Sequence, residues 1–589
     1  MFQIRWLWRN MDGRYRWRYI TALILSVVTS CLLLVNPYLT KILFDDVILA
    51  ENTEPLLGIL LLMLGMQAVR LSLRYLMIIY LEKSSQNVLF NLRSRLFEVL
   101  QYQEMRFFDR NRTGDLMTRL SADVDWCRHF LAYLSYTALD SVVMFVSTLI
   151  LFFSISWKLT LLLLAVTPLL MLITKLYSKK VRPLFVGMRD RLSEMNTAAQ
   201  ENIAGNRVVK AFAREDYEKE RFHQKNADFR DANLDINKLW LTFFPFIEIL
   251  ANAMSLITIF LGGLFIIWGE ITPGELTIFT SLAWALANPM RNLGNLINDM
   301  QRFAASANKI IEVYYSRPLI VDRQDAEDHP QPKGKIEFRD VSFSFGSVKV
   351  LDHVSFTVEP GQTLAVMGPT GSGKTTLINL LSRFYDVDGG QVLVDDCDVH
   401  FWKLQQLRHA VGTATQEVFL FSDTVEGNIV FGNQALTEEE AQDYARRAGA
   451  AEFVVKMPES YDTIVGERGV GLSGGQKQRL ALARAMAVEP AVLVLDDTTS
   501  ALDMETEKYI QQQLRELPYA CTKIIIAQRI SSVKDADQII VLQNGEIAER
   551  GTHEELLKNK GYYWETYALQ NGIEDAPVAS AAALRGGEA

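Results

Sequence analysis

One glycine-rich stretch constrains the fold of this chain more than any other feature. Residues Gly368–Thr376 read Gly-Pro-Thr-Gly-Ser-Gly-Lys-Thr-Thr. They follow the apolar run Thr363–Met367 and precede the helical pattern Leu377–Ser382. A strand, a glycine-rich loop and a helix in this order are the context of a phosphate-binding loop. The sequence therefore predicts a nucleoside triphosphate site on an α/β domain.

The residue types in this loop each suit a nucleotide. Glycines let backbone N–H groups surround phosphate oxygens, and the following helix adds the positive end of its dipole. Lys374 brings a charge to the terminal phosphates, and the Thr375 hydroxyl is placed to ligate Mg²⁺. The predicted binding residues are Gly368, Pro369, Thr370, Gly371, Ser372, Gly373, Lys374, Thr375 and Thr376.

Composition excludes some classes of protein. The 589 residues include 60 basic and 69 acidic side chains, a net charge of −9, which argues against a nucleic-acid-binding protein. Long apolar runs occur only before about residue 305, and the remainder resembles a soluble α/β domain. The four cysteines show no metal-ligand spacing and are expected to be free thiols in a reducing compartment.

Six apolar segments precede the phosphate loop, at about 20–43, 56–81, 136–156, 158–177, 240–268 and 274–298. Most approach the roughly 20 residues that a helix needs to cross a bilayer. Residues 1–19 carry arginines among tryptophans, with no small-residue cleavage site after them. They predict a helix lying along the inner membrane surface rather than a removable signal peptide. The lipid bilayer is thus a predicted partner.

Loop charges predict the orientation of these segments. The basic N-terminus and the connections 82–135 and 178–239 are expected inside, and the acidic loop 44–55 outside, so both termini are cytoplasmic. Both inside connections are expected to continue the membrane helices into the cytosol, with short helices near Asp115–Asp123 and Lys210–Lys219. Such arms either carry force between membrane and cytosol or are solvated charged helices without a partner.

Polar side chains within the apolar segments are candidates for a substrate cavity, because charges and amides are costly in lipid. Arg70 lies in the second segment, Glu248 in the fifth, and Trp284 and Asn288 in the sixth. Contacts between helices, or side chains that reach the inner interface, are the alternative interpretation. For Arg70 and Glu248 we favour the lining of an inner cavity.

A polar stretch with two prolines, Asp322–Lys335, has neither helical nor strand periodicity and marks a domain boundary. The tail after residue 570 is rich in alanine and glycine and is expected to be disordered. The predicted parts are an amphipathic helix at 1–19, a transmembrane domain at 20–305, a linker at 306–335, a nucleotide-binding domain at 336–570 and a tail at 571–589.

Two acids end a second buried strand, Ala491–Asp497. A strand of this kind places Asp496 beside the phosphate loop, where a carboxylate can hold Mg²⁺ through water. Asp497 follows at a position where a carboxylate could polarise the attacking water. The alternation of apolar residues in Ile336–Val358 predicts antiparallel strands ahead of the loop.

A second anion-binding arrangement lies between the loop and the acidic strand. An amphipathic helix follows Leu472, Ser473, Gly474, Gly475 and Gln476. Ser-Gly-Gly at a helix N-terminus can bind an anion. Two such helix starts are unusual for one nucleotide, and the second is explained if it serves a nucleotide on another subunit.

These motifs, in this order, resemble those of the ATP-binding cassette (ABC) transporters, and the six segments with long arms resemble the exporter, or type IV, branch. The resemblance covers about residues 5–570 and indicates a half-transporter. It implies an α-helical six-segment transmembrane domain plus an α/β P-loop nucleotide-binding domain, with a RecA-like core, an antiparallel β subdomain and an α-helical subdomain. It also implies ATP and Mg²⁺ as ligands.

The resemblance implies roles for further residues. Phe345 would stack on adenine, where the family usually has tyrosine. Gln416 would contact Mg²⁺ together with Thr375 and Asp496, and Asp503 belongs to the D-loop. Leu472–Gln476 corresponds to the family's signature motif. The two short cytosolic helices resemble coupling helices, which favours the force-carrying interpretation of the arms.

Two positions depart from the family pattern, and both are catalytic. The family's general base after the acidic strand is glutamate, and here it is Asp497, shorter by one methylene. A carboxylate drawn back by that distance loses the geometry needed to activate water. The family's switch histidine is replaced by Gln528, which can hydrogen-bond a phosphate but cannot exchange a proton with it near neutral pH.

Both departures affect residues needed for hydrolysis, whereas the phosphate loop and the signature motif are intact. This combination predicts that binding and hydrolysis of ATP are divided between two different subunits. We expect a heterodimer with a second half-transporter, in which this chain's own site is degenerate and Ser473 helps complete a competent site. The expected function is ATP-driven export of small amphiphilic molecules, multidrug or lipid-like, across the plasma (inner) membrane. The alternatives are a homodimeric exporter of lipid or peptide with slow ATPase and an ATP-gated regulatory membrane protein.

Overall fold

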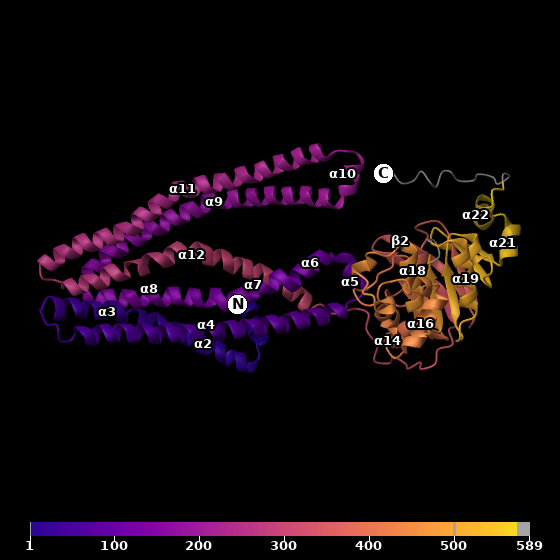
Figure 1. The fold of residues 1–589 in the computed structure, drawn as a ribbon, viewed down its shortest axis with the longest axis horizontal. Helices are drawn as coiled ribbons and strands as arrows, with labels where there is room; N and C mark the ends of the chain where they lie inside the picture. The colour runs from indigo at the N-terminus through magenta and orange to yellow at the C-terminus, as the bar shows by residue number, and fades with distance from the viewer. Residues whose placement is uncertain (1, 499–501, 574–589) are drawn as a thin grey trace. The chain divides into compact units, whose positions relative to one another are not determined.

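The computed structural model describes residues 2–498 and 502–573 (Figure 1). The predicted disordered tail therefore lies mostly outside the described residues. Two compact units make up the chain. The first contains the residues up to 102 and residues 111–316, and the second contains residues 103–110 and the residues from 317 onward.

The first unit is built from helices. They are α1 (Phe2–Arg9), α2 (Gly13–Leu33), α3 (Val35–Ile42), α4 (Leu56–Gln101), α6 (Thr113–Thr118), α7 (Val124–His129), α8 (Ser135–Ile155), α9 (Trp157–Ala204), α10 (Asn206–Ala211), α11 (Glu215–Ile267) and α12 (Pro273–Tyr314). π-Helical turns at Leu43–Ile48, Arg119–Asp123 and Phe130–Leu134 join several of them into longer rods.

Five of these rods are long and apolar enough to cross a membrane: Gly13–Ile48, Leu56–Gln101, Thr113–Ile155, Trp157–Ala204 and Glu215–Ile267. They contain the first five predicted segments. The sixth segment lies in α12, which is helical throughout. Asparagine and arginine side chains interrupt its apolar run, so it is less apolar than the other five.

The long arms form as the sequence predicts. α9 and α11 contain 48 and 53 residues and run side by side well beyond their apolar segments (Figure 1). At a rise of 1.5 Å per residue, each extends over about 70–80 Å. Ion pairs such as Lys225 with Glu194, at 2.6 Å, join their charged halves.

The short helices lie elsewhere than expected. Residues 115–123 belong to a continuous rod that runs from Thr113 to Ile155, and the separate short helix is α5 (Met105–Arg110). On the other arm the short helix is α10, not 210–219, because α11 already begins at Glu215. α9 ends at Ala204, with Gly205 as its C-terminal cap, and Ala213, at a φ of +49°, lies in the turn that follows α10.

The outer end of α12 is fixed by a network of hydrogen bonds. Thr272 and Glu275 form a capping box, in which each side chain bonds the other residue's backbone N–H. Asp45 accepts hydrogen bonds from the Thr272 hydroxyl at 2.6 Å and from the Gly274 N–H at 2.8 Å. Lys41 forms an ion pair with Glu275 at 2.9 Å. The start of α12 is thereby tied to the turn after α3.

The second unit contains two sheets. A four-stranded antiparallel sheet has the order β2-β1-β4-β5, and a six-stranded sheet has the order β10-β9-β3-β8-β7-β6. Their bounds are β1 (Ile336–Phe345), β2 (Val348–Val358), β3 (Thr363–Met367), β4 (Gly389–Val394), β5 (Cys397–Asp398), β6 (Val411–Ala414), β7 (Val492–Asp496), β8 (Thr522–Ile526), β9 (Gln538–Gln543) and β10 (Glu546–Gly551).

Every strand pair of the larger sheet is parallel except β9 and β10. β3 and β7 are mainly apolar and almost wholly buried, as expected of strands covered on both faces, and β8 ends in three isoleucines. β1 and β2 are antiparallel, as the alternation of Ile336–Val358 predicts. The helical membrane unit and this α/β unit confirm the predicted fold class.

Helices complete the second unit. They are α5 (Met105–Arg110), α13 (Lys374–Leu381), α14 (Leu404–Ala410), α15 (Val425–Ile429), α16 (Glu438–Arg447), α17 (Ala451–Val454), α18 (Gly474–Ala487), α19 (Met504–Arg515), α20 (Ile530–Val533), α21 (His553–Asn559) and α22 (Tyr562–Gln570). α15 and α16 pack against α18. These three helices share a hydrophobic core that is separate from the core between the two sheets.

Candidate functional site

The phosphate loop connects β3 to α13, as predicted. Gly373 is the residue before the helix and has a φ of +102°. A β-carbon there would lie 2.7 Å from the Leu351 side chain and 3.0 Å from the Val350 carbonyl oxygen, so glycine is needed for both conformation and space. The Lys374 ammonium donates to the backbone oxygens of Gly368 and Pro369 at 2.8 and 2.7 Å.

A pocket of about 340 Å³ lies at this loop, at the carboxyl ends of β3, β7 and β8. Among the predicted site residues it is lined by Thr370, Gly371, Gly373, Lys374, Thr375, Thr376, Gln416, Asp496, Asp497 and Gln528. Parallel strands explain this gathering, because their carboxyl ends meet at one edge of the sheet. The structure thus brings together groups that lie more than 150 residues apart in the chain.

Three residues predicted to bind Mg²⁺ share this pocket. Thr375 donates its hydroxyl proton to an Asp496 carboxylate oxygen at 3.2 Å, and Gln416 follows the end of β6 on the same pocket. Asp496 is only 4% exposed. Burial raises the pKa of its carboxyl group, the charge of Asp497 adds to the rise, and the bond from Thr375 opposes it. A buried carboxylate beside a hydroxyl and an amide oxygen fits a hard divalent cation.

The electrostatics of Lys374 also suit a polyanion. Burial lowers the pKa of its ammonium group, and the charges of Asp496 and Asp497 act in the opposite direction. A partly desolvated ammonium group gains more from a nearby phosphate than an exposed one, because water screens their attraction less. This loop can therefore hold the terminal phosphates of a nucleotide with Mg²⁺ bound beside them.

Asp497 and Gln528, the two residues that depart from the family pattern, both line the pocket. Asp497 has a φ of +49°, and its backbone N–H donates to the Ile526 carbonyl oxygen at 2.9 Å. Gln528 follows β8, and its carbonyl oxygen accepts a hydrogen bond from the Gln570 side chain at 2.8 Å. Backbone contacts therefore hold both residues in place, and only their side chains differ from the expected glutamate and histidine.

The signature residues do not line this pocket. Ser473 caps α18: its hydroxyl accepts the Gln476 N–H at 3.3 Å, and the Gln476 side chain accepts the Ser473 N–H at 2.8 Å. Ser473 and Gly474 are exposed, and Leu472, Gly475 and Gln476 are partly exposed. Asp503 caps α19 through bonds to Thr506, which lower the pKa of its carboxyl group. Neither helix start contributes a lining residue to the pocket at this chain's own loop.

Phe345, the predicted adenine-stacking residue, is also outside the pocket lining and is 39% exposed. Its ring lies at the end of β1 and makes edge-on contacts with Phe343 and Tyr385, with centroids 4.9 and 5.2 Å apart. These contacts leave its exposed side available to a planar group.

Contacts that the sequence did not reveal join α5 and the residue before it to the rest of the second unit. The Tyr385 hydroxyl donates to an Asp109 carboxylate oxygen at 2.8 Å, and Glu104 accepts the Leu319 N–H at 2.9 Å. Burial, then the bond to Asp109, raise the pKa of Tyr385 to about 12. Tyr385 and Asp109 are 276 residues apart, and no local pattern connects them.

The membrane unit contains a polar pocket of about 290 Å³ between α2, α4, α8 and α12. Arg70, Trp284 and Asn288, three residues predicted to line a substrate cavity, line this pocket together with Arg74 and with Asp140, which the sequence did not reveal as a part of it. Asp140 accepts a hydrogen bond from Ser30. Glu248, also predicted to line a cavity, lies on α11, which supplies no lining residue to this pocket.

An apolar pocket of about 480 Å³ adjoins the polar one, and Ser141 and Pro289 line both. Apart from Gln301 and Ser141, its lining side chains are apolar, and they include Val142, Phe145 and Met300. A polar compartment beside an apolar one matches the two ends of an amphiphile.

Comparison with known proteins identifies both units. The family model of the ABC transporter transmembrane region matches residues 19–290, and the family model described as ABC transporter matches residues 351–500. An ATP-dependent lipid A-core flippase of Syntrophus aciditrophicus (strain SB) is 35% identical over 94% of this chain and 92% of its own length. A putative multidrug export ATP-binding/permease protein, YgaD of Bacillus subtilis (strain 168), is 33% identical over 95% and 97%.

Two further relatives agree. An uncharacterized ABC transporter ATP-binding protein, YknU of Bacillus subtilis (strain 168), is 36% identical over 96% of both chains. The solved structure of a bacterial Atm1-family ABC exporter with ATP bound has a TM-score of 0.78 and 26% identity, and the match covers 97% of this chain and all of that one. The chain therefore belongs to the ABC transporter family, as a multi-pass membrane exporter with its membrane domain fused to an ATP-binding cassette.

Proposed function

We propose that this chain is the degenerate-site subunit of a heterodimeric exporter of small amphiphilic molecules. The observation that carries the proposal is the place of Asp497 and Gln528, which line the phosphate pocket beside Lys374 and Asp496. Both stand where the family has its base and its switch residue, and neither can supply that chemistry. The pocket therefore retains groups that bind MgATP and lacks the groups that hydrolyse it.

Binding uses this chain's own residues. The loop N–H groups and Lys374 hold the phosphates, and Thr375, Asp496 and Gln416 hold Mg²⁺, which neutralises phosphate charge when bound. A general base must reach the attacking water within hydrogen-bond distance, and base catalysis contributes roughly 10²–10⁴-fold. With Asp497 one methylene short and Gln528 unable to move a proton, hydrolysis at this pocket is slow.

The signature serves the other nucleotide. Ser473 and Gly474 are exposed at the start of α18, and α18 places no residue in this chain's own pocket. A second half-transporter would supply ATP to this helix start, and its glutamate and histidine would complete hydrolysis there. Closure of the two cassettes on ATP drives export, and hydrolysis at the competent site resets the transporter.

The membrane pockets support an amphiphilic cargo. A polar group would bind beside Arg70, Arg74 and Asp140, and an apolar chain would enter the pocket lined by Phe145 and Met300. Relatives include proteins named as a lipid A-core flippase and a putative multidrug exporter, both consistent with this class of cargo. We place both termini in the cytoplasm and the protein in the plasma membrane, from the loop charges.

Two substitutions in the assembled heterodimer test whether only one of the two nucleotide sites hydrolyses ATP. Ser473→Ala should abolish most ATP turnover, because it weakens the competent site, whereas Asp497→Ala should change turnover little. Both are measured as ATPase rates of the purified complex in lipid nanodiscs, with Lys374→Ala as a control for nucleotide binding at this chain's loop. The opposite ranking would place hydrolysis in this chain's own pocket and refute the proposal.

A further inference from the structure

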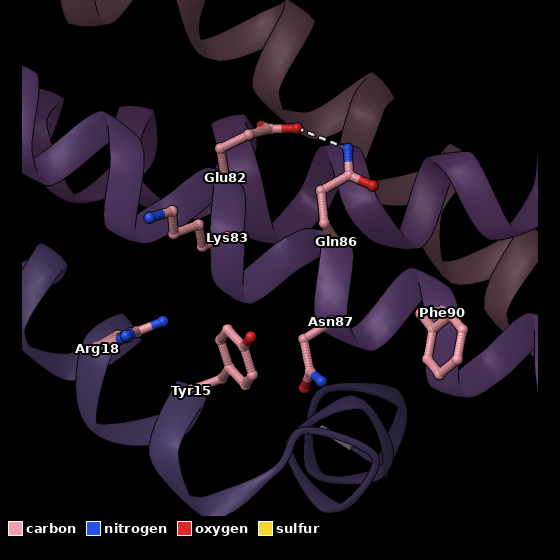
Figure 2. A pocket seen from close by; sticks show the side chains of 7 residues that line it. All are labelled: Tyr15, Arg18, Glu82, Lys83, Gln86, Asn87 and Phe90. Carbon is pink, nitrogen blue, oxygen red and sulfur yellow. Dashed lines mark hydrogen bonds between the residues drawn. The ribbon is translucent and has the colours of Figure 1, made fainter.

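A pocket of about 480 Å³ lies between the start of α2 and the middle of α4, away from the substrate pockets (Figure 2). Tyr15 and Arg18 of α2 form one wall, and Glu82, Lys83 and Phe90 of α4 form the other. None of these residues lines the nucleotide pocket or the two other membrane pockets, so this pocket needs an explanation of its own.

Hydrogen bonds hold the two walls together. Asn87 donates to an Asp12 carboxylate oxygen at 2.6 Å and accepts the Asp12 N–H at 3.1 Å. The buried hydroxyl of Ser84 donates to the Tyr15 carbonyl oxygen at 3.1 Å. The turn before α2 is therefore fixed on α4, and the pocket is a built feature of the fold rather than a gap between loose helices.

The pocket carries an excess of positive charge. Its one carboxylate, Glu82, is already engaged, because it forms an ion pair with Arg128 at 3.3 Å and accepts a hydrogen bond from Gln86 at 2.8 Å. Arg18 and Lys83 form no ion pair with any residue that the structure describes. Figure 2 shows both cationic groups on the same side of the pocket, with Arg18 beside Tyr15 and Lys83 nearer Glu82. The pocket is thus complementary to an anion.

The pocket also lies where the chain changes from apolar to charged. The membrane-crossing rod that contains α2 begins at Gly13, and the apolar run of α4 ends just before Glu82. Trp17 and Phe90 are 73% and 69% exposed at this level, as aromatic residues at a membrane–water boundary are. α4 leads from here into residues 103–110, which belong to the cassette unit, so this is the end predicted to be cytoplasmic.

We propose that this pocket binds the phosphate headgroup of an anionic phospholipid from the cytoplasmic leaflet. Arg18 and Lys83 would contact the phosphate, and Tyr15 and Phe90 would contact the glycerol and the first part of the acyl chains. Basic pockets between transmembrane helices on this side suit such headgroups. Bound lipid would hold the start of α2 against α4 and so stabilise the membrane unit.

Lipid retention by the purified, full-length transporter tests the proposal. The protein is exchanged into detergent and mixed with phosphatidylglycerol or phosphatidylcholine. Native mass spectrometry then measures how tightly each lipid binds. Arg18→Gln/Lys83→Gln should weaken phosphatidylglycerol binding about 30-fold, since each cation near an anionic surface contributes a factor of about five. Arg18→Lys/Lys83→Arg should keep binding and thereby show that the site still folds. Phosphatidylcholine should bind weakly to all variants.

The control is Arg9→Gln/Arg14→Gln, which removes the same charge from exposed positions of the same N-terminal region. This variant should retain the lipid. Equal loss in both glutamine variants would show diffuse attraction to the surface and overturn the proposal, as would full retention by Arg18→Gln/Lys83→Gln. Inorganic phosphate should not displace the lipid, and complete displacement at millimolar concentration would identify a free-phosphate site instead.

Discussion

At the residue scale, the phosphate pocket brings the residues predicted to bind a nucleotide together with two residues that depart from the family pattern. Lys374, Thr375 and Asp496 keep the family's chemistry and lie together. Asp497 and Gln528 keep the family's positions without its side chains. Because backbone contacts fix both positions, restoring the side chains should restore the missing chemistry without remodelling the pocket.

The double variant Asp497→Glu/Gln528→His should therefore raise ATP turnover of this chain's own site by at least about tenfold, since general base catalysis is worth roughly 10²–10⁴. Turnover is measured on the heterodimer whose other site has been inactivated by Ser473→Ala. Asp497→Glu alone should recover only part of the gain. No increase in the double variant would mean that another feature of the pocket limits hydrolysis.

The Tyr385–Asp109 hydrogen bond is a second residue-scale test, because it joins α5 to the cassette fold. Tyr385→Phe removes one hydrogen bond, worth about 1 kcal/mol, and keeps the ring contacts. Basal ATP turnover should remain, and its stimulation by transported compounds should fall. The control is Tyr444→Phe, which removes a similar bond to Glu489 in the helical subdomain. If both variants reduced this stimulation equally, α5 would have no special role in linking transported compounds to ATP turnover.

At the scale of elements, the turn before α12 depends on Asp45, whose carboxylate accepts hydrogen bonds from Thr272 and Gly274. Asp45→Ala removes both bonds and should cost about 2 kcal/mol, because hydrogen bonds to a charged acceptor are stronger than neutral ones. Thermal unfolding of the purified protein should show a lower melting temperature. Asp46→Ala, at the exposed neighbouring position, should leave it nearly unchanged, and an equal shift would contradict this account.

Elements defined by local sequence were predictable, and those defined by tertiary contacts were not. The long helices and the strand–loop–helix around Gly368–Thr376 follow from apolar runs and glycines. The short helix α5 was missed because it lies beside a break that the sequence shows only as Asp109–Gly114, and its docking depends on Tyr385. Only some residues of the polar membrane pocket were predicted. Asp140 lines it beside Arg70 because α8 packs on α2 and α12, and this packing cannot be read from the local sequence.

At the scale of the whole molecule, the fold is that of an ABC exporter, and the proposed division of labour makes each nucleotide site depend on two chains. The signature at Leu472–Gln476 is intact, exposed and outside this chain's own pocket. In the proposed heterodimer, this chain would contribute one half of each of two nucleotide sites. The proposal therefore requires the other site to keep the groups that hydrolyse ATP.

ATP turnover by the purified chain without a second half-transporter tests this claim most directly. The chain alone should bind MgATP, with binding lost in Lys374→Ala, and should hydrolyse almost none of it. Rapid hydrolysis by the chain alone, abolished by Asp497→Ala, would show a competent site within a homodimer and contradict the proposed division of labour.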